Sequence, residues 1–165
     1  RAEGLPITAS TPARSLVLDE QVHHARPYDT RLRLHPPLRT AGDRIALLAA
    51  VRDGTLLLAA DHAPRAPEEK DLEFERATPG SSGLESAFSA AFSALDGDLD
   101  ALVRAFCVGP RALLPARTGG LTLIDPAAAM RVAAAGHRSR ARNDALDGHA
   151  LTGVVRGCFP ESSVL

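Results

Sequence analysis

Asp61 and His62 are the residues of this sequence whose types and position most clearly suggest chemistry. They follow a short apolar run, residues 56–60, that Gly54 and Pro64 bound on either side. A run of this length between turn residues predicts a buried strand. Where a strand of a parallel α/β barrel gives way to its loop, an aspartate can ligate a metal ion or accept a proton from a metal-bound water. An Asp–His pair after a strand can also be a simple turn, with the aspartate bonded to nearby backbone N–H groups, and this stretch alone leaves both interpretations open.

The size and composition of the chain limit the classes of protein it can represent. Its 165 residues are enough for one domain with a core, but they fall short of the roughly 250 residues of a complete (β/α)8 barrel. The net charge is −1, so we expect no strong attraction to nucleic acid or to membranes. The basic cluster at residues 137–143 has no interleaved aromatic residues, which argues against a nucleic-acid partner.

The cysteines and the start of the chain bear on its cellular compartment. Cys107 and Cys158 make no metal-binding or redox spacing. With no signal peptide and no long apolar segment, the sequence predicts a reduced, soluble, cytoplasmic protein. The chain opens at Arg1 without an initiator methionine, which leads us to expect a longer reading frame.

The elements that position the candidate aspartate form a βα unit followed by a strand. Composition predicts a strand at residues 7–11, and alternation predicts a few extended residues at 32–34. Thr40 as N-cap and Asp43 in the first turn predict a helix, which the Asp-Gly pair at residues 53–54 ends. A strand follows, as in the repeating unit of parallel sheets and barrels.

A long charged loop, residues 65–83, separates this strand from the helices of the second half. Ser82 and Glu85 match a capping box, in which serine and glutamate side chains bond to each other's backbone N–H groups. Asp98 is placed to cap a second helix. We expect the apolar stripes of both helices to be core, namely Leu84, Phe88, Ala91, Phe92 and Leu95, and then Leu99, Leu102, Val103 and Phe106.

The last third of the chain predicts two short strands. One helical turn is expected at residues 110–114 and a strand at 121–124. The alanine-rich segment 127–135 is expected to be irregular or weakly helical, and residues 151–159 alternate well enough for a final strand.

Five motifs follow one another in the order and spacing of a known family. They are Arg1-Ala2-Glu3-Gly4-Leu5-Pro6-Ile7-Thr8-Ala9, which leads into a strand; His35-Pro36-Pro37-Leu38-Arg39, similar to Asn-Pro-Pro-Leu-Arg; Asp61-His62-Ala63-Pro64-Arg65, similar to Asp-His-Ala-Pro-His; Pro79-Gly80 with Gly83-Leu84-Glu85; and Arg138-Ser139-Arg140-Ala141-Arg142-Asn143. Through them the chain resembles the C-terminal part of class I dihydroorotases, of the amidohydrolase superfamily.

The resemblance implies a fold and a set of site residues. Residues 1–120 would be the late βα units of a TIM-type (β/α)8 amidohydrolase barrel, incomplete in this chain, and residues 121–165 a small C-terminal β portion. The activity implied is metal-dependent, with zinc, and interconverts carbamoyl aspartate and dihydroorotate in pyrimidine synthesis. Asp61 would be the catalytic, metal-binding carboxylate of the last strand, which deprotonates the bridging water and passes the proton to the leaving amide nitrogen. The substrate-binding residues implied are His35, Arg65, Pro79 and Gly80.

Several positions depart from the family's pattern. His35 stands where the family has asparagine, Arg65 where it has histidine, and residues 11–14 read Thr-Pro-Ala-Arg in place of Thr-Pro-His-His. Arg65 can still bind a carboxylate as a bidentate donor, but it is bulkier and permanently charged. The resemblance places the other metal ligands before Arg1, and a zinc site needs at least three protein ligands. We therefore expect these residues alone not to hydrolyse dihydroorotate.

Two hypotheses for the function follow. In the first, the chain is part of a working dihydroorotase or a related cyclic amidase. In the second, it is a non-catalytic homologue that holds an aspartate transcarbamoylase assembly together, since polar site residues are replaced while the scaffold motifs remain. The sequence upstream of Arg1 would distinguish them.

Late barrel strands without the early ones expose unpaired edges, so we also expect the isolated chain to be oligomeric or poorly soluble.

Overall fold

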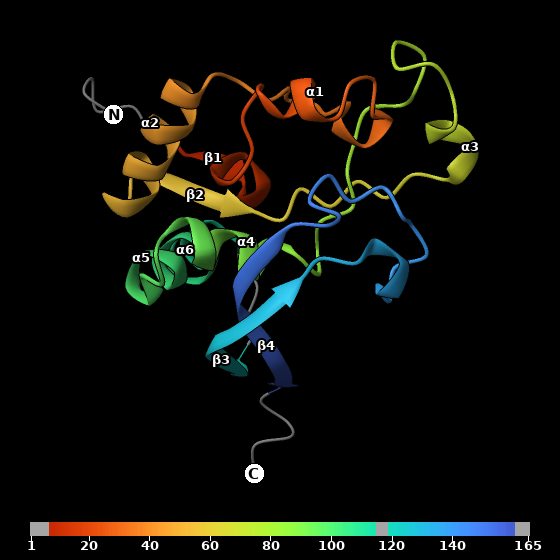
Figure 1. Ribbon diagram of the computed structural model, residues 1–165. Coiled ribbons are helices and arrows are strands. Elements are labelled where there is room, and N and C mark those ends of the chain that lie inside the picture. Colours follow the sequence, from red (N-terminus) through yellow and green to blue (C-terminus); the bar gives the residue numbers. More distant parts are fainter. Residues whose placement is uncertain (1–6, 115–118, 161–165) are drawn as a thin grey trace.

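A computed structural model describes residues 7–114 and 119–160, and two parallel strands lie at the centre of its first half (Figure 1). β1 (Ala9–Pro12) and β2 (Leu56–Ala59) pair in parallel. The strand expected at 7–11 begins and ends slightly later, and the strand before the candidate aspartate is confirmed. Because both strands run in one direction, their carboxyl ends lie at the same edge, where parallel sheets place their functional groups.

The crossover from β1 to β2 contains helix α2 (Ala41–Arg52), which has the caps that the sequence predicts. The Asp43 N–H donates to Thr40 Oγ1 at 3.2 Å, and the Thr40 N–H donates to Asp43 Oδ2 at 3.1 Å. After the C-cap Asp53, Gly54 adopts a φ of 80° that reverses the chain into β2. The two reciprocal bonds satisfy N–H groups that a helix start leaves free.

Short helical turns occupy the segment between β1 and α2. A 3₁₀ turn, η1 (Ala13–Leu16), follows β1 directly, and α1 (Val22–Ala25) and a second 3₁₀ turn, η2 (Thr30–Leu32), come next. The expectation of extended residues at 32–34 is wrong at its start, because Asp29 caps η2 with its side chain and holds it helical.

A helical layer continues the chain after the long loop. It comprises α4 (Ala87–Ala94), α5 (Leu99–Val103), a π-helical turn η3 (Arg104–Val108) and α6 (Gly109–Leu113). As predicted, Asp98 caps α5, accepting a hydrogen bond from the Ala101 N–H at 3.0 Å. In Figure 1 these helices lie together below β2. The buried apolar residues that they and the first half contribute to the core include Leu16, Leu32, Val51, Leu58, Phe92, Leu95 and Leu102.

Three residues expected in the core are exposed. The exposed fractions are 64% for Leu84, 38% for Leu99 and 45% for Val103. All three line an apolar cavity of about 470 Å³. The cavity beside these side chains keeps them open to solvent, so their stripe is not buried.

The second sheet is an antiparallel pair, β3 (Gly120–Arg131) and β4 (Ala150–Pro160). It packs against α4, where the Thr152 N–H donates to Ser93 Oγ at 2.7 Å. The strand predicted near the end of the chain is thereby confirmed.

β3 is longer than the sequence predicts. A strand was expected only at 121–124, and residues 127–135 were expected to be irregular or weakly helical, yet the strand continues to Arg131. A register shift between Asp125 and Ala129 carries the strand past a proline, which has no N–H to donate. Cross-strand pairing then overrides the weak β propensity of the alanines.

The described residues form no closed sheet. One sheet has two parallel strands and the other two antiparallel strands. A domain boundary between residues 120 and 121 stays a prediction. Among residues 7–114 and 119–160, no helix has the length and apolar character needed to cross a membrane.

Candidate functional site

Asp61 and Arg14 meet at the carboxyl ends of the two parallel strands. Asp61 follows β2 with a left-handed φ of 45°, and Arg14 lies in η1 directly after β1. Arg14 Nη2 forms an ion pair with Asp61 Oδ2, and Arg14 Nη1 donates to the Asp61 carbonyl oxygen at 3.0 Å. The Arg14 side chain is only 4% exposed, whereas that of Asp61 is 36% exposed. The carboxylate of Asp61 is thus bound by a buried guanidinium, a partner that the motif does not indicate.

His62 binds the backbone at the end of the long loop, at residues 83 and 84. Its Nδ1 accepts hydrogen bonds from the Gly83 N–H at 3.2 Å and the Leu84 N–H at 3.3 Å. An acceptor at Nδ1 means that a neutral ring carries its proton on Nε2. A side chain at Gly83 would come within 3.1 Å of the Ala60 carbonyl oxygen, so the glycine permits this approach. His62 therefore positions backbone beside Asp61.

Arg65, Pro79 and Gly80, three of the predicted substrate-binding residues, lie together. Arg65 Nε donates to the Pro79 carbonyl oxygen at 3.0 Å, and the Gly80 N–H donates to the Arg33 carbonyl oxygen at 2.9 Å. Gly80 has a φ of 134°, and a Cβ there would lie 2.9 Å from Ala63 Cβ. Both ends of the long loop are thus brought into contact, and only glycine fits at their closest point.

Asn143 joins these loop ends and was not among the predicted site residues. Its side chain is buried, and its Oδ1 accepts from the Arg65 N–H at 3.2 Å. Its Nδ2 donates to the carbonyl oxygens of Ala63 and Gly80, both at 3.1 Å. The only signal in the sequence was its place at the end of the Arg138–Asn143 motif, because its partners lie 63 to 80 residues away.

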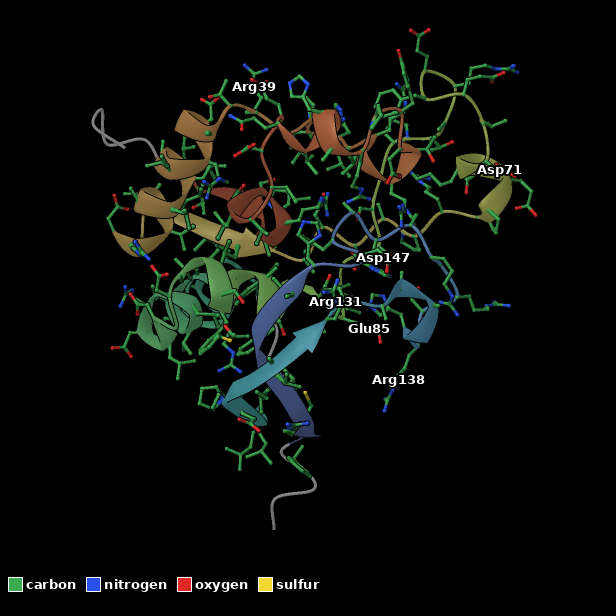
Figure 2. The ribbon with its side chains drawn as sticks, viewed as in Figure 1. Arg39, Asp71, Glu85, Arg131, Arg138 and Asp147 are labelled. Atoms are coloured by element: carbon green, nitrogen blue, oxygen red, sulfur yellow. The ribbon has the colours of Figure 1, made fainter. Side chains whose placement is uncertain are left out.

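The capping box predicted for Ser82 and Glu85 is wrong. The helix begins only at Ala87, and the Glu85 carboxylate instead accepts from the N–H groups of Arg138 at 2.9 Å and Ser139 at 3.0 Å. Burial acts to raise the pKa of Glu85, but these two hydrogen bonds and nearby positive charge outweigh it, so that the pKa is lowered. Figure 2 shows Glu85 beside the C-terminal loop, with the Arg138 side chain extending outward. Glu85 therefore anchors the segment that carries Asn143.

A cavity of about 280 Å³ adjoins Arg65 and Asn143 and is rich in cationic groups. Lys70, in the short helix α3 (Pro67–Lys70), is buried there and donates to the Thr30 carbonyl oxygen at 2.8 Å. Burial, followed by repulsion from Arg65 and Arg33, lowers the pKa of Lys70 to about 8. The charged residues on its lining are Asp29, Arg31, Arg65, Lys70, Asp71 and Arg142.

His35 makes no direct bond to the other predicted site residues in the described part of the chain. It is exposed, and within the described residues no hydrogen bond or ion pair joins it to Asp61 or Arg65. Arg33, two residues earlier, accepts a hydrogen bond from the Gly80 N–H through its carbonyl oxygen, while His35 itself faces solvent.

The residues present do not fit a zinc ion. Within residues 7–114 and 119–160, no group of three or more histidine, cysteine, aspartate or glutamate side chains could hold a metal. Asp61, the one carboxylate expected to bind zinc, is already paired with Arg14. The imidazole of the next residue, His62, uses Nδ1 to accept from two backbone N–H groups.

Comparison with curated sequences gives a consistent set of relatives, although no protein-family model matches the chain. It is 33% identical to a dihydroorotase of Citrifermentans bemidjiense over 95% of this chain and 41% of the relative. It is 38% identical to a dihydroorotase of Anaeromyxobacter dehalogenans, over 93% and 38%, and 36% identical to one of Streptomyces coelicolor, over 94% and 39%. The chain spans about 40% of the length of the curated relatives it matches.

Comparison with solved structures confirms the fold. A D-hydantoinase superposes with a TM-score of 0.84 at 22% identity, over 97% of this chain and 39% of that one. L-Hydantoinase from Arthrobacter aurescens gives 0.85 at 21%, over 96% and 39%. Dihydroorotase from Saccharomyces cerevisiae, in complex with 5-fluoroorotic acid, gives 0.77 at 15%, over 98% and 46%. The fold is thus that of an incomplete amidohydrolase barrel, as predicted.

Proposed function

The chain belongs to the dihydroorotase family, and on that premise we propose that it forms the late part of a dihydroorotase-like protein of pyrimidine biosynthesis. The substrate class is a small cyclic amide, with dihydroorotate and carbamoyl aspartate as the pair interconverted. One observation carries the proposal: an aspartate lies at the carboxyl end of β2, and the loop ends bearing Arg65, Pro79 and Gly80 are joined beyond it by Asn143.

The charge around Arg65 supports an acidic ligand. Dihydroorotate carries a carboxylate, and the cavity beside Arg65 is lined by four cationic side chains against two carboxylates. Arg142 bonds only to backbone carbonyl oxygens in the described residues, so its charge is not neutralised by a carboxylate. Arg65 Nε is bonded to the Pro79 carbonyl oxygen and Nη1 lies 3.6 Å from Glu69 Oε1, so a substrate carboxylate that binds this guanidinium with two parallel hydrogen bonds would compete with Glu69. His35, Pro79 and Gly80 remain proposed substrate contacts, although the Pro79 carbonyl and Gly80 N–H are bonded within the protein.

Hydrolysis of the amide requires more than this chain's described residues supply. A catalytic zinc ion needs three protein ligands, and the site offers one carboxylate that is already paired. We therefore propose that these residues contribute substrate binding and the barrel scaffold, without hydrolysis of their own. No observation favours the alternative role as a partner of aspartate transcarbamoylase.

Binding of dihydroorotate tests this proposal. We expect the protein, in its longest natural form, to bind dihydroorotate, and Arg65→Met to raise Kd about tenfold or more, the equivalent of about 1.4 kcal/mol. Arg76→Met is the matched control, because Arg76 is exposed and its ion pair in the described part of the chain is with Glu73 on the surface. Isothermal titration calorimetry measures all three proteins. Absence of binding by the parent protein, or equal Kd values for the parent and Arg65→Met, would contradict the proposed function.

Self-association of the isolated chain is a further expectation. β1 and β2 pair only with each other in the described residues, so each strand keeps a free edge. Exposed apolar side chains lie nearby, including those of Ile7, Leu113 and Leu114. We expect sedimentation velocity to show dimers or larger species that increase with concentration. A monodisperse monomer that melts cooperatively would show this expectation to be wrong.

A further inference from the structure

We propose that Arg14 takes the place of a metal ion as the positive charge opposite Asp61, so that Asp61 binds no metal in this protein. The inference rests on the proposed function in one respect, that Asp61 is the last-strand carboxylate of a dihydroorotase-like site. It concerns what neutralises that carboxylate, and it does not depend on whether dihydroorotate binds.

Two contacts hold the Arg14 guanidinium against Asp61. One terminal nitrogen of Arg14 pairs with Oδ2, and the other donates to the carbonyl oxygen of the same residue at 3.0 Å. Two donors of a planar group that meet two acceptors of one residue fix its orientation as well as its distance. The Arg14 side chain is only 4% exposed, so the guanidinium itself has little contact with water.

Backbone hydrogen bonds also fix the main chain at Arg14. The Arg14 carbonyl oxygen accepts from the N–H groups of Val17 at 3.1 Å and Leu18 at 2.9 Å. Its predecessor Ala13 is fully buried and offers only a methyl group at the carboxyl end of β1. The η1 turn therefore holds Arg14, and with it the guanidinium, at this edge of the sheet.

A metal ion bound to the Asp61 carboxylate would lie close to the positively charged Arg14 guanidinium. Arginine carries a permanent positive charge in proteins, so a second cation at Asp61 would have to lie beside it. Two positive charges within a few ångströms repel each other, and burial of the Arg14 side chain strengthens this repulsion. The described residues supply no cluster of further ligands to compensate.

Metal retention tests the inference. The protein in its longest natural form is loaded with zinc chloride, dialysed against metal-free buffer and measured by elemental analysis, in parallel with Asp61→Asn. We expect equal zinc content in the two proteins, because zinc bound elsewhere contributes equally to both. The control is Asp96→Asn, which removes a carboxylate that pairs with Arg52 at 2.6 Å on the exposed surface. Loss of one zinc per chain in Asp61→Asn alone would overturn the inference.

A measurement on the unmutated protein does not depend on whether the Asp61→Asn variant folds. We expect the guanidinium N–H signals of Arg14, assigned by nuclear magnetic resonance, to be protected from solvent exchange and unchanged when zinc is added. Their shift or loss on stoichiometric zinc addition would overturn the inference. Either contrary result would leave the dihydroorotate titration unaffected, so the failure of this inference and that of the proposed function are distinguishable.

Discussion

Asn143→Leu is expected to cause the largest loss of stability among single substitutions at the site, about 3–5 kcal/mol in the free energy of unfolding. Leucine has a similar volume but no polar atoms. The substitution leaves the Arg65 N–H and the carbonyl oxygens of Ala63 and Gly80 without the partner that Asn143 supplies. Each such buried polar group costs about 1–3 kcal/mol when it loses its partner. Urea denaturation followed by circular dichroism measures the change.

The control for Asn143→Leu lies in the same segment. Arg140 is exposed, so Arg140→Leu introduces the same side chain where no buried bond is broken, and its effect is expected within about 0.5 kcal/mol. Because Asn143 joins Arg65 to Gly80, its loss is also expected to weaken dihydroorotate binding where Arg140→Leu does not. A change below about 1 kcal/mol for Asn143→Leu would mean that the loop ends hold together without it.

Asp61→Asn is expected to destabilise the protein more than Arg14→Met, by about 2–3 kcal/mol against about 1 kcal/mol. The asymmetry follows from burial, because removal of the carboxylate leaves a charge on Arg14, which is 4% exposed, while removal of the guanidinium leaves a carboxylate that water can reach. Asparagine tolerates the left-handed φ of Asp61, so this substitution changes charge without adding backbone strain.

Asp96→Asn is a closely matched control for this comparison. Asp96 also has a positive φ, of 54°, and also pairs with an arginine, but its side chain is 85% exposed. A surface ion pair contributes about 0–1 kcal/mol, so we expect a loss below that of Asp61→Asn. Thermal and urea denaturation of the three variants measure the order. Equal losses for Asp61→Asn and Asp96→Asn would contradict a special role for the Arg14 pair.

Local patterns predicted those parts of the structure that depend on neighbours in sequence. Thr40 and Asp43 form the capping box that their spacing indicates, and Asp98 caps α5. Ser82 and Glu85 have an equally good pattern, but Glu85 bonds to backbone 53 and 54 residues later, so tertiary contacts displaced the local bond. A sequence pattern cannot show which of two possible partners a carboxylate will take.

The same limit explains which residues of the site could be predicted from the sequence and which could not. The position of Asp61 after a strand was predictable, because a short apolar run and a turn proline mark it. Its partner Arg14 was visible only as a departure from a motif, since the two residues lie 47 positions apart and meet through the pairing of β1 with β2. Asn143 depends on still longer separations. The exposed stripe of Leu99 and Val103 was predicted as core because periodicity shows which side is apolar but not what packs against it.

A double-mutant cycle of Arg14→Met and Asp61→Asn tests most directly the claim that the guanidinium neutralises this carboxylate. The coupling energy is obtained from urea denaturation of the parent, the two single variants and the double variant, first with a chelator and then with excess zinc. We expect a coupling of about 1–2 kcal/mol that zinc does not change. A coupling near zero, or one that disappears when zinc is present, would contradict it.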